Sequence, residues 1–205
     1  GRPQPASRRE AQVETIRTIS EIIIYGEQNS EQELIFDYFC EKNMLALLTD
    51  IMKFPGSDET VQIQIVQTVA ILVQNVRNET SLFYLLSNNY INEMITFDPL
   101  PTQGVMSDDL LSHLVSFLKT LSLRLDPRTV QFFIADSPSR SRGGARESAF
   151  PLYDRVLRFI TQVSDSMART SALNIVLNLY RVEDPGLRSF LLRQEKRQLF
   201  FRAVG

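Results

Sequence analysis

Cysteine, histidine and tryptophan are almost absent from this chain of 205 residues, which has one cysteine, one histidine and no tryptophan. A disulfide within the chain is therefore excluded, and so is a zinc site built from cysteine and histidine ligands. Cys40 could act as a nucleophile with His113 as its base. Because both residues lie in apolar helical stretches, we favour a buried thiol and a half-exposed imidazole, and we expect neither catalysis nor a bound metal or cofactor.

Long hydrophobic runs and glycine-rich motifs are missing as well. The longest apolar runs, such as residues 22–24 and 69–73, fall far short of the roughly 18 residues that cross a membrane. Gly143 and Gly144 lack the spacing of a phosphate-binding loop, and no strand is expected before them. The sequence therefore predicts no membrane-spanning helix, no secretory signal, and no nucleotide or other small-molecule substrate.

Charge is nearly balanced overall but is divided unevenly along the chain. The net charge is −2, yet residues 1–100 carry 7 basic and 14 acidic side chains, whereas residues 101–205 carry 15 and 10. Such polarity can steer a charged partner or an anionic surface toward one end. The basic excess is too small, and too little interleaved with aromatic residues, to predict a nucleic-acid partner.

Apolar residues recur at every third or fourth position, which predicts an all-α protein. Residues 58–76 carry two such stripes, as expected for a helix that packs on more than one side. Asp126–Pro127 and Asp184–Pro185 each place an N-cap residue before a proline at the first helical position. The predicted helices span residues 8–25, 31–41, 44–53, 58–77, 80–87, 90–96, 107–124, 127–134, 151–163, 165–181, 185–193 and 195–203.

Three stretches share one order of elements, in which a long apolar helix is followed by a short linker and a shorter helix. They cover residues 71–85, 117–133 and 175–190, at irregular spacing. This irregular repetition is typical of armadillo or HEAT units with loops of variable length. We therefore expect an armadillo/HEAT-like, right-handed α-solenoid of about three to four irregular helical units, with a concave groove.

In armadillo proteins an asparagine on the third helix of a unit often holds an extended peptide, since its amide pairs with both peptide N–H and C=O. The corresponding positions here are Asn75, Ser122 and Asn178, and Arg181 lies close to the last of them in sequence. These four residues are the predicted partner-binding set. Only two of the three positions carry asparagine, so capping or internal hydrogen bonds explain them equally well.

Residues 135–149 interrupt the helical pattern with serine, arginine and glycine. We expect a mobile loop there. Serine beside arginine and proline is compatible with phosphorylation, which would reverse the local charge, although a solvated insertion without a role is the simpler interpretation.

Four longer segments resemble the FPL-domain family, the family of the endosomal-maturation protein Ema and its animal and plant homologues. They are FDYFCEKNML at 36–45, VRNETSLFYLLSNN at 76–89, SFLKTLSLRL at 116–125 and FPLY at 150–153. The resemblance runs in order from about residue 11 to residue 204. It implies a single FPL domain over residues 1–205, expected to be the N-terminal module of a longer protein.

The resemblance also implies a function in endosomal trafficking, retrograde sorting, autophagy and mitophagy. The expected protein is a non-catalytic adaptor or scaffold in the cytoplasm, attached peripherally to endosome, Golgi and lysosome membranes. Its expected partners are an endosomal sorting complex such as retromer, a Rab-type GTPase or a tether, and a ubiquitin ligase.

Two alternatives remain open. The basic end of the chain could bind anionic lipid at a membrane surface, because several basic residues stand there beside leucine and phenylalanine. The same pattern also fits the last capping helix of a solenoid. The second alternative is a non-RING subunit of a ubiquitin-ligase complex, since the chain cannot supply zinc ligands of its own. The basic residues concerned are Arg188, Arg193, Lys196, Arg197 and Arg202.

Overall fold

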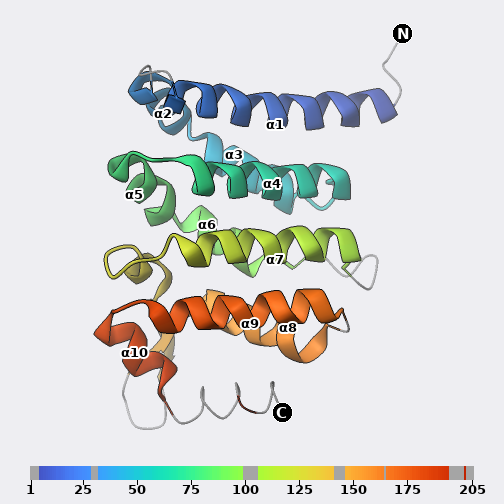
Figure 1. Cartoon of the computed structure of the whole chain (residues 1–205). Coiled ribbons are helices and arrows are strands. Elements are labelled where there is room, and N and C mark those ends of the chain that lie inside the picture. Colours follow the sequence, from blue (N-terminus) through green and yellow to red (C-terminus); the bar gives the residue numbers. More distant parts are fainter. Residues whose placement is uncertain are drawn as a thin grey trace. The chain divides into compact units, whose positions relative to one another are not determined.

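The computed structural model describes residues 5–28, 32–98, 106–140, 146–163, 165–193 and 201 (Figure 1). Helices make up most of this part of the chain, which confirms the predicted all-α class. The helices are α1 (Pro5–Gln28), α2 (Gln32–Glu41), α3 (Met44–Lys53), α4 (Glu59–Asn75), α5 (Glu79–Ser87), α6 (Asn89–Thr96), α7 (Asp108–Leu123), α8 (Pro151–Gln162), α9 (Ser166–Arg181) and α10 (Pro185–Leu191).

The described residues form two compact units. Unit 1 comprises residues 1–85 and 97–117, and unit 2 comprises residues 86–96 and 118–205. Each unit is described by itself below. The right-handed solenoid and the single FPL domain stay predictions.

Unit 1 is built around α4, which packs against α1 and α3. Ile65, Val69 and Leu72 of one predicted stripe are fully buried, as are Val66 and Val73 of the other, whose remaining members are half-buried. Two glutamines on the same helix are buried as well, and their amides are satisfied. Gln62 donates to the Met52 carbonyl at 3.1 Å, and Gln64 donates to the Thr68 hydroxyl at 3.3 Å. Burial without loss of hydrogen bonds keeps these polar groups from destabilising the core.

Unit 2 is organised by the FPLY segment at residues 150–153. Pro151 is the first residue of α8, which in turn packs against α6 and α9. Phe150 and Tyr153 are fully buried and both meet the Phe190 ring of α10 edge to face, at centroid distances of 5.9 and 6.0 Å. Such edge-to-face pairs are a favourable aromatic geometry. The segment therefore joins the start of α8 to α10 in the core of the unit.

Two predicted elements of unit 2 differ in the structure. The helix expected at 127–134 is a turn followed by a 3-10 segment, Val130–Phe133. The side chain of Asp126 does accept from two backbone N–H groups, those of Arg128 and Thr129, both at 2.8 Å. The chain then leaves the turn at Ile134, whose backbone is extended, so the 3-10 segment ends there.

The described part of the expected loop at 135–149 contains two short strands. β1 (Ala135–Arg140) pairs with β2 (Arg146–Ala149) in an antiparallel manner, with a register irregularity between Asp136 and Arg140. Pairing satisfies backbone groups that a non-helical segment would otherwise leave to water. The helix expected at 195–203 lies outside the described residues except for Phe201.

Candidate functional site

Two of the predicted groove residues bind each other inside unit 2. The Asn178 amide on α9 donates to the Ser122 hydroxyl on α7 at 3.0 Å, and Ser122 donates to the Lys119 carbonyl at 2.8 Å. Ser122 is only 3% exposed, so it cannot present its hydroxyl to a partner. The prediction for Ser122 is therefore corrected, because this side chain joins two helices of the unit. At this position an internal hydrogen bond takes the place of a peptide contact.

Asn75 is the last residue of α4 in unit 1 and is exposed. Its amide donates to the Ile71 carbonyl at 2.8 Å, one turn back in the same helix. One of the two N–H donors of each asparagine amide is thus engaged within the protein.

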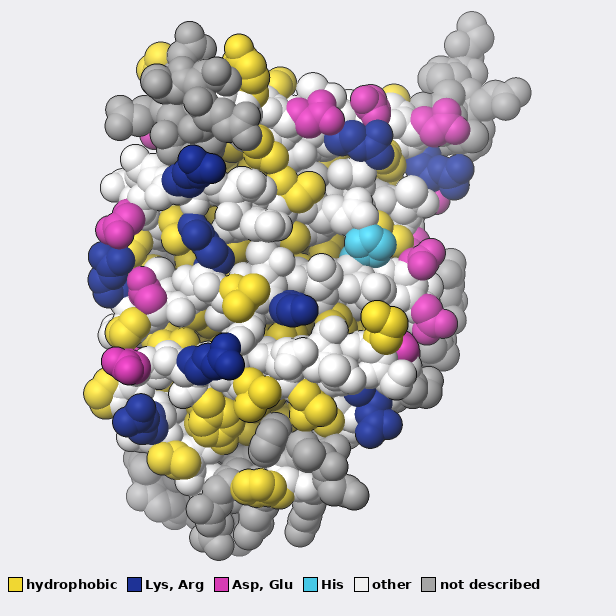
Figure 2. Space-filling model, viewed as in Figure 1, with side chains coloured by type: hydrophobic (Ala, Val, Ile, Leu, Met, Phe, Trp, Pro, Cys, Tyr) yellow, Lys and Arg dark blue, Asp and Glu magenta, His cyan; other side chains and the backbone are white. Residues whose placement is uncertain are grey.

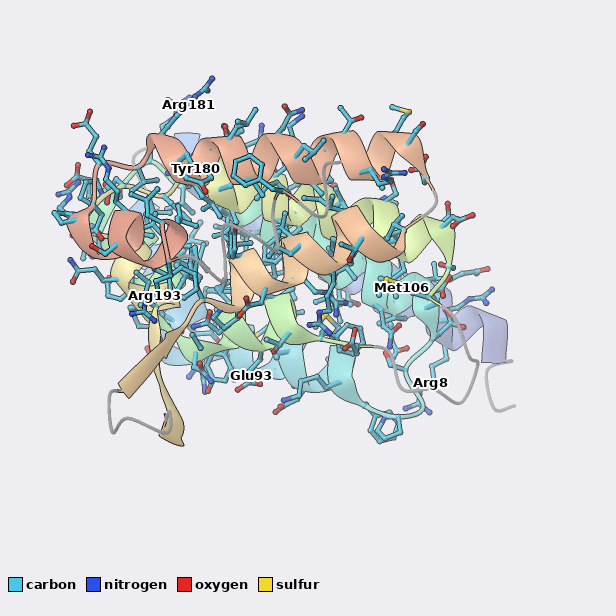
Figure 3. The ribbon with its side chains drawn as sticks, turned by 90° about the horizontal axis from the view of Figure 1, so that it is seen from below. Arg8, Glu93, Met106, Tyr180, Arg181 and Arg193 are labelled. Atoms are coloured by element: carbon cyan, nitrogen blue, oxygen red, sulfur yellow. The ribbon has the colours of Figure 1, made fainter. Side chains whose placement is uncertain are left out.

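Arg181 has a different setting, on the exposed side of α9. The inner side of this helix buries Ala172, Ile175, Val176 and Leu179. The helical period places Leu177 and Arg181 on the side opposite these core residues, and Tyr180 on the flank between the two sides. Leu177 is 52% and Tyr180 is 37% exposed. Figure 3 shows Tyr180 and Arg181 on α9, with Arg181 extending away from the ribbon.

The end of unit 2 beyond α9 adds further basic and apolar side chains. Arg188 and Arg193 are exposed, and Leu192 beside them is 54% exposed. The Arg193 guanidinium lies 5.7 Å from the centre of the Phe190 ring, which orients it over the core aromatic cluster. Figure 2 shows hydrophobic side chains gathered along α9 with basic side chains beside them. We use the name basic–apolar face for the exposed basic and apolar side chains of α9 and of the residues from α10 onward; they are Leu177, Tyr180, Arg181, Arg188, Leu192 and Arg193. Lys196, Arg197 and Arg202 lie outside the described residues.

Tyr180 is connected to the core by a hydrogen bond with Tyr153 of the FPLY segment. Burial of Tyr153 raises its pKa far above the ordinary value, and the neighbouring charges and hydroxyl of Tyr180 and Asp154 add to this effect. Tyr153 therefore stays a neutral donor at all physiological pH values. The exposed ring of Tyr180 is held at the surface by a buried residue.

Most of the chain, although not the basic residues from Arg181 onward, falls within a recognised family. The family model named FPL, described as an uncharacterised conserved protein, matches residues 16–180. The chain belongs to the FPL family. No solved structure matches the chain.

Curated relatives extend the match of this FPL chain nearly to its ends. The CLEC16A homolog of Drosophila melanogaster is 38% identical over 188 residues, which cover 90% of this chain and 16% of the relative. Human CLEC16A is 40% identical over 172 residues, or 83% of this chain and 14% of the relative. TRANSPARENT TESTA 9 of Arabidopsis thaliana is 29% identical over 192 residues, or 94% and 21%. The FPL chain thus spans about one seventh to one fifth of these relatives.

Cys40 and His113 of the FPL chain do not form the nucleophile and base considered from sequence. Burial, and secondarily the charge of Asp37, raises the pKa of the Cys40 thiol to about 11, although a hydrogen bond with Tyr84 opposes the rise. Both ring nitrogens of His113 are engaged, Nε2 with the Gln67 amide at 2.6 Å and Nδ1 with the Asp109 carbonyl at 2.8 Å. In this arrangement the two nitrogens of His113 face Gln67 and Asp109 and not a thiol.

Across the parts of the FPL chain that the structure describes, no group of three or more histidine, cysteine or acidic residues could hold a metal ion. None of the helices within the described ranges is long and apolar enough to span a bilayer.

Sequence reasoning did not single out Leu177 and Tyr180 of the FPL chain as surface residues, whereas Leu192 belongs to the basic, leucine-containing end considered for lipid binding. The signal for Leu177 was available, because it stands opposite the four core residues of α9 in the helical period. The hydrogen bond between Tyr153 and Tyr180 had no signal in the sequence, since it depends on how α8 packs against α9.

Proposed function

We propose that this FPL chain is a non-catalytic adaptor in endosomal trafficking, which acts in retrograde sorting and autophagy by binding protein partners. It works in the cytoplasm and attaches peripherally to endosome, Golgi or lysosome membranes. Membership of the FPL family over residues 16–180 supports the proposal, together with the function that the family resemblance implies. The partner classes are a sorting complex, a Rab-type GTPase or tether, and a ubiquitin ligase.

The observation that carries the binding site is the exposed apolar part of the basic–apolar face. Tyrosine and arginine are enriched among the residues that contribute most to protein interfaces. Here Tyr180 and Arg181 stand side by side on α9, next to Leu177, at a surface that water covers in the free unit. The hydrogen bond with Tyr153 restricts Tyr180 before binding, which lowers the entropy lost when a partner docks.

The test is capture of partners from cytosol by the purified chain, with the bound proteins identified by mass spectrometry. The variant Leu177→Glu/Arg181→Glu changes the face without touching the core, because both side chains are exposed. Met167→Glu/Arg169→Glu is the matched control, since it makes the same charge change at exposed positions of the same helix. We expect the parent and the control to capture sorting-complex subunits or a Rab-type GTPase, and the face variant to lose them.

A third variant separates the face from the armadillo-type groove. Asn75→Ala/Asn178→Ala is expected to keep full capture, because both amides donate within the protein. If only this variant loses capture, the binding site lies at the asparagine positions and not at the basic–apolar face. If none of the proteins captured belongs to a trafficking complex, the adaptor function is wrong.

The exposed Arg188, Leu192 and Arg193 favour a second candidate, binding of anionic lipid at the same end of unit 2. Sedimentation with phosphatidylcholine vesicles, with and without phosphatidylserine, tests it. Binding that requires phosphatidylserine and disappears in Arg188→Glu/Arg193→Glu supports a lipid function. Equal sedimentation of the parent and this variant contradicts it.

A further inference from the structure

The outer sides of α1 and α2 in unit 1 expose apolar side chains. α1 directs Ile16 and Ile23 into the core, where they are 5% and 3% exposed. The opposite side of the helix leaves Ile22 and Tyr25 at 50% and 62% exposed. A helix that packs by one stripe normally has polar residues on the other side, so this pair is an exception to the usual pattern.

α2 repeats the arrangement of α1. Phe36 and Phe39 are buried, and Phe36 meets Tyr84 of α5 edge to face at 6.4 Å. The other side of α2 leaves Leu34 at 77% and Tyr38 at 61% exposed. Both helices therefore turn an apolar pair away from the helices on which they pack.

The two exposed pairs lie on neighbouring helices, because α1 and α2 pack against each other (Figure 1). Gly26 of α1 lies directly against Ile35 of α2, so that a Cβ atom on Gly26 would stand 2.9 Å from the Ile35 Cδ1 atom. Glycine is what permits this close approach. We call the resulting surface the acidic–apolar face; it consists of Glu21, Ile22, Tyr25, Leu34, Asp37, Tyr38 and Glu41.

Acidic residues predominate in this region of the chain, although the Lys42 ammonium lies 5.1 Å from the centre of the Tyr38 ring. Residues 21–41 include six acidic residues and no lysine or arginine. Glu41 is paired with Lys42 at 3.1 Å, but Glu21 and Asp37 form no ion pair among the residues that the structure describes. The charge of Asp37 also acts on its surroundings, since it contributes to the raised pKa of Cys40.

We propose that the acidic–apolar face docks a cationic amphipathic helix of a protein partner. Four exposed apolar side chains on two adjacent helices offer a seat for the apolar stripe of a third helix. Glu21 and Asp37 complement lysine or arginine that flanks such a stripe, which speeds association and disfavours acidic competitors. The basic–apolar face of unit 2 has the opposite charge, so the two surfaces select different partners. The docking site does not depend on the proposed adaptor function.

The test uses a fluorescent model peptide of about 18 residues, with leucine at helical spacing and lysine or arginine between. A scrambled peptide of the same composition keeps the charge but removes the apolar stripe. Fluorescence anisotropy measures the affinity of the full chain for both. Two variants change the face, Glu21→Lys/Asp37→Lys and Ile22→Ser/Leu34→Ser. The control Glu10→Lys/Asp50→Lys makes the same charge change at exposed acids of α1 and α3 outside the face.

We expect the amphipathic peptide to bind the parent and the control equally, and each face variant at least tenfold more weakly. Its binding should also weaken as salt rises, because exposed charges are screened. Equal affinity for the scrambled peptide, or equal loss in the control, would reduce the interaction to general charge attraction and overturn the proposal. Sedimentation velocity supplies the other decisive measurement. If the parent chain self-associates and the face variants do not, the face binds a second copy of the chain, and the proposal of a partner helix is wrong.

Discussion

The Cys40 thiol should be alkylated much more slowly in the folded chain than in the unfolded chain. Its pKa is raised from the ordinary 9.0 to about 11 by burial and by the charge of Asp37. Only the thiolate reacts with iodoacetamide. At pH 8 about one thiol in ten is ionised at the ordinary pKa, and about one in a thousand at the raised value. The folded chain should therefore react about 100-fold more slowly than the chain unfolded in urea.

The assay follows the mass of the alkylated chain with time at pH 8, with and without urea. Asp37→Asn should speed the reaction of the folded chain, because it removes a charge that raises the pKa. Asp50→Asn, an exposed acid on α3, should leave the rate unchanged. A folded chain that reacts within tenfold of the unfolded one, or that is not accelerated by Asp37→Asn, would refute this account of Cys40.

The same shift makes stability depend on pH in a defined direction. The unfolded thiol has the lower pKa, so the unfolded chain loses its proton first as pH rises. The ionisation of Cys40 therefore leaves the free energy of unfolding unchanged below pH 9 and lowers it between pH 9 and about 11. Cys40→Ser should remove this part of the decline.

Two further changes test the core and the caps of unit 2. Phe190→Ala removes the ring that Phe150 and Tyr153 share, and we expect urea unfolding to show a loss of roughly 3–5 kcal/mol, whereas Phe190→Leu should lose much less. A loss below about 1 kcal/mol for Phe190→Ala would contradict the role given to this ring. Asp165 accepts from the backbone N–H groups of Met167 and Ala168 at 3.1 and 3.0 Å, so Asp165→Ala should cost about 1–2 kcal/mol and Asp165→Asn clearly less. Equal losses for alanine and asparagine would mean that capping is not the reason.

Helices were predictable from this sequence wherever the period and the end signals agree. α4 is the clearest instance, since two apolar stripes demand contacts on two sides and the helix does pack on α1 and α3. Asp184–Pro185 likewise starts α10, with the Asp184 carboxylate accepting from the Leu187 N–H at 2.6 Å. Asp126–Pro127 carries the same signal but opens only a turn and a 3-10 segment. A cap stabilises the first turn and cannot extend a helix beyond the residues that pack.

Surface positions were harder to predict than helices, and the reason is the same for the basic–apolar face and the acidic–apolar face. The helical period tells which residues lie opposite the core, and this is enough to expose Leu177 on α9 or Tyr38 on α2. It does not tell which neighbouring helix those residues meet. Asn178 was placed in a groove by analogy, but α7 brings the Ser122 hydroxyl within 3.0 Å of its amide. Such pairings depend on tertiary packing, and the spacing of residues along the sequence does not reveal them.

The FPLY segment shows how a family signature can act on a surface without being part of it. Phe150 and Tyr153 are fully buried, so no partner can contact them directly. Their rings hold Phe190, over which the exposed Arg193 guanidinium lies, and the Tyr153 hydroxyl binds Tyr180. Two residues of the basic–apolar face, on α9 and beyond α10, therefore take their positions from one buried cluster. The signature specifies the core and, through it, the arrangement of the surface that we propose for partner binding.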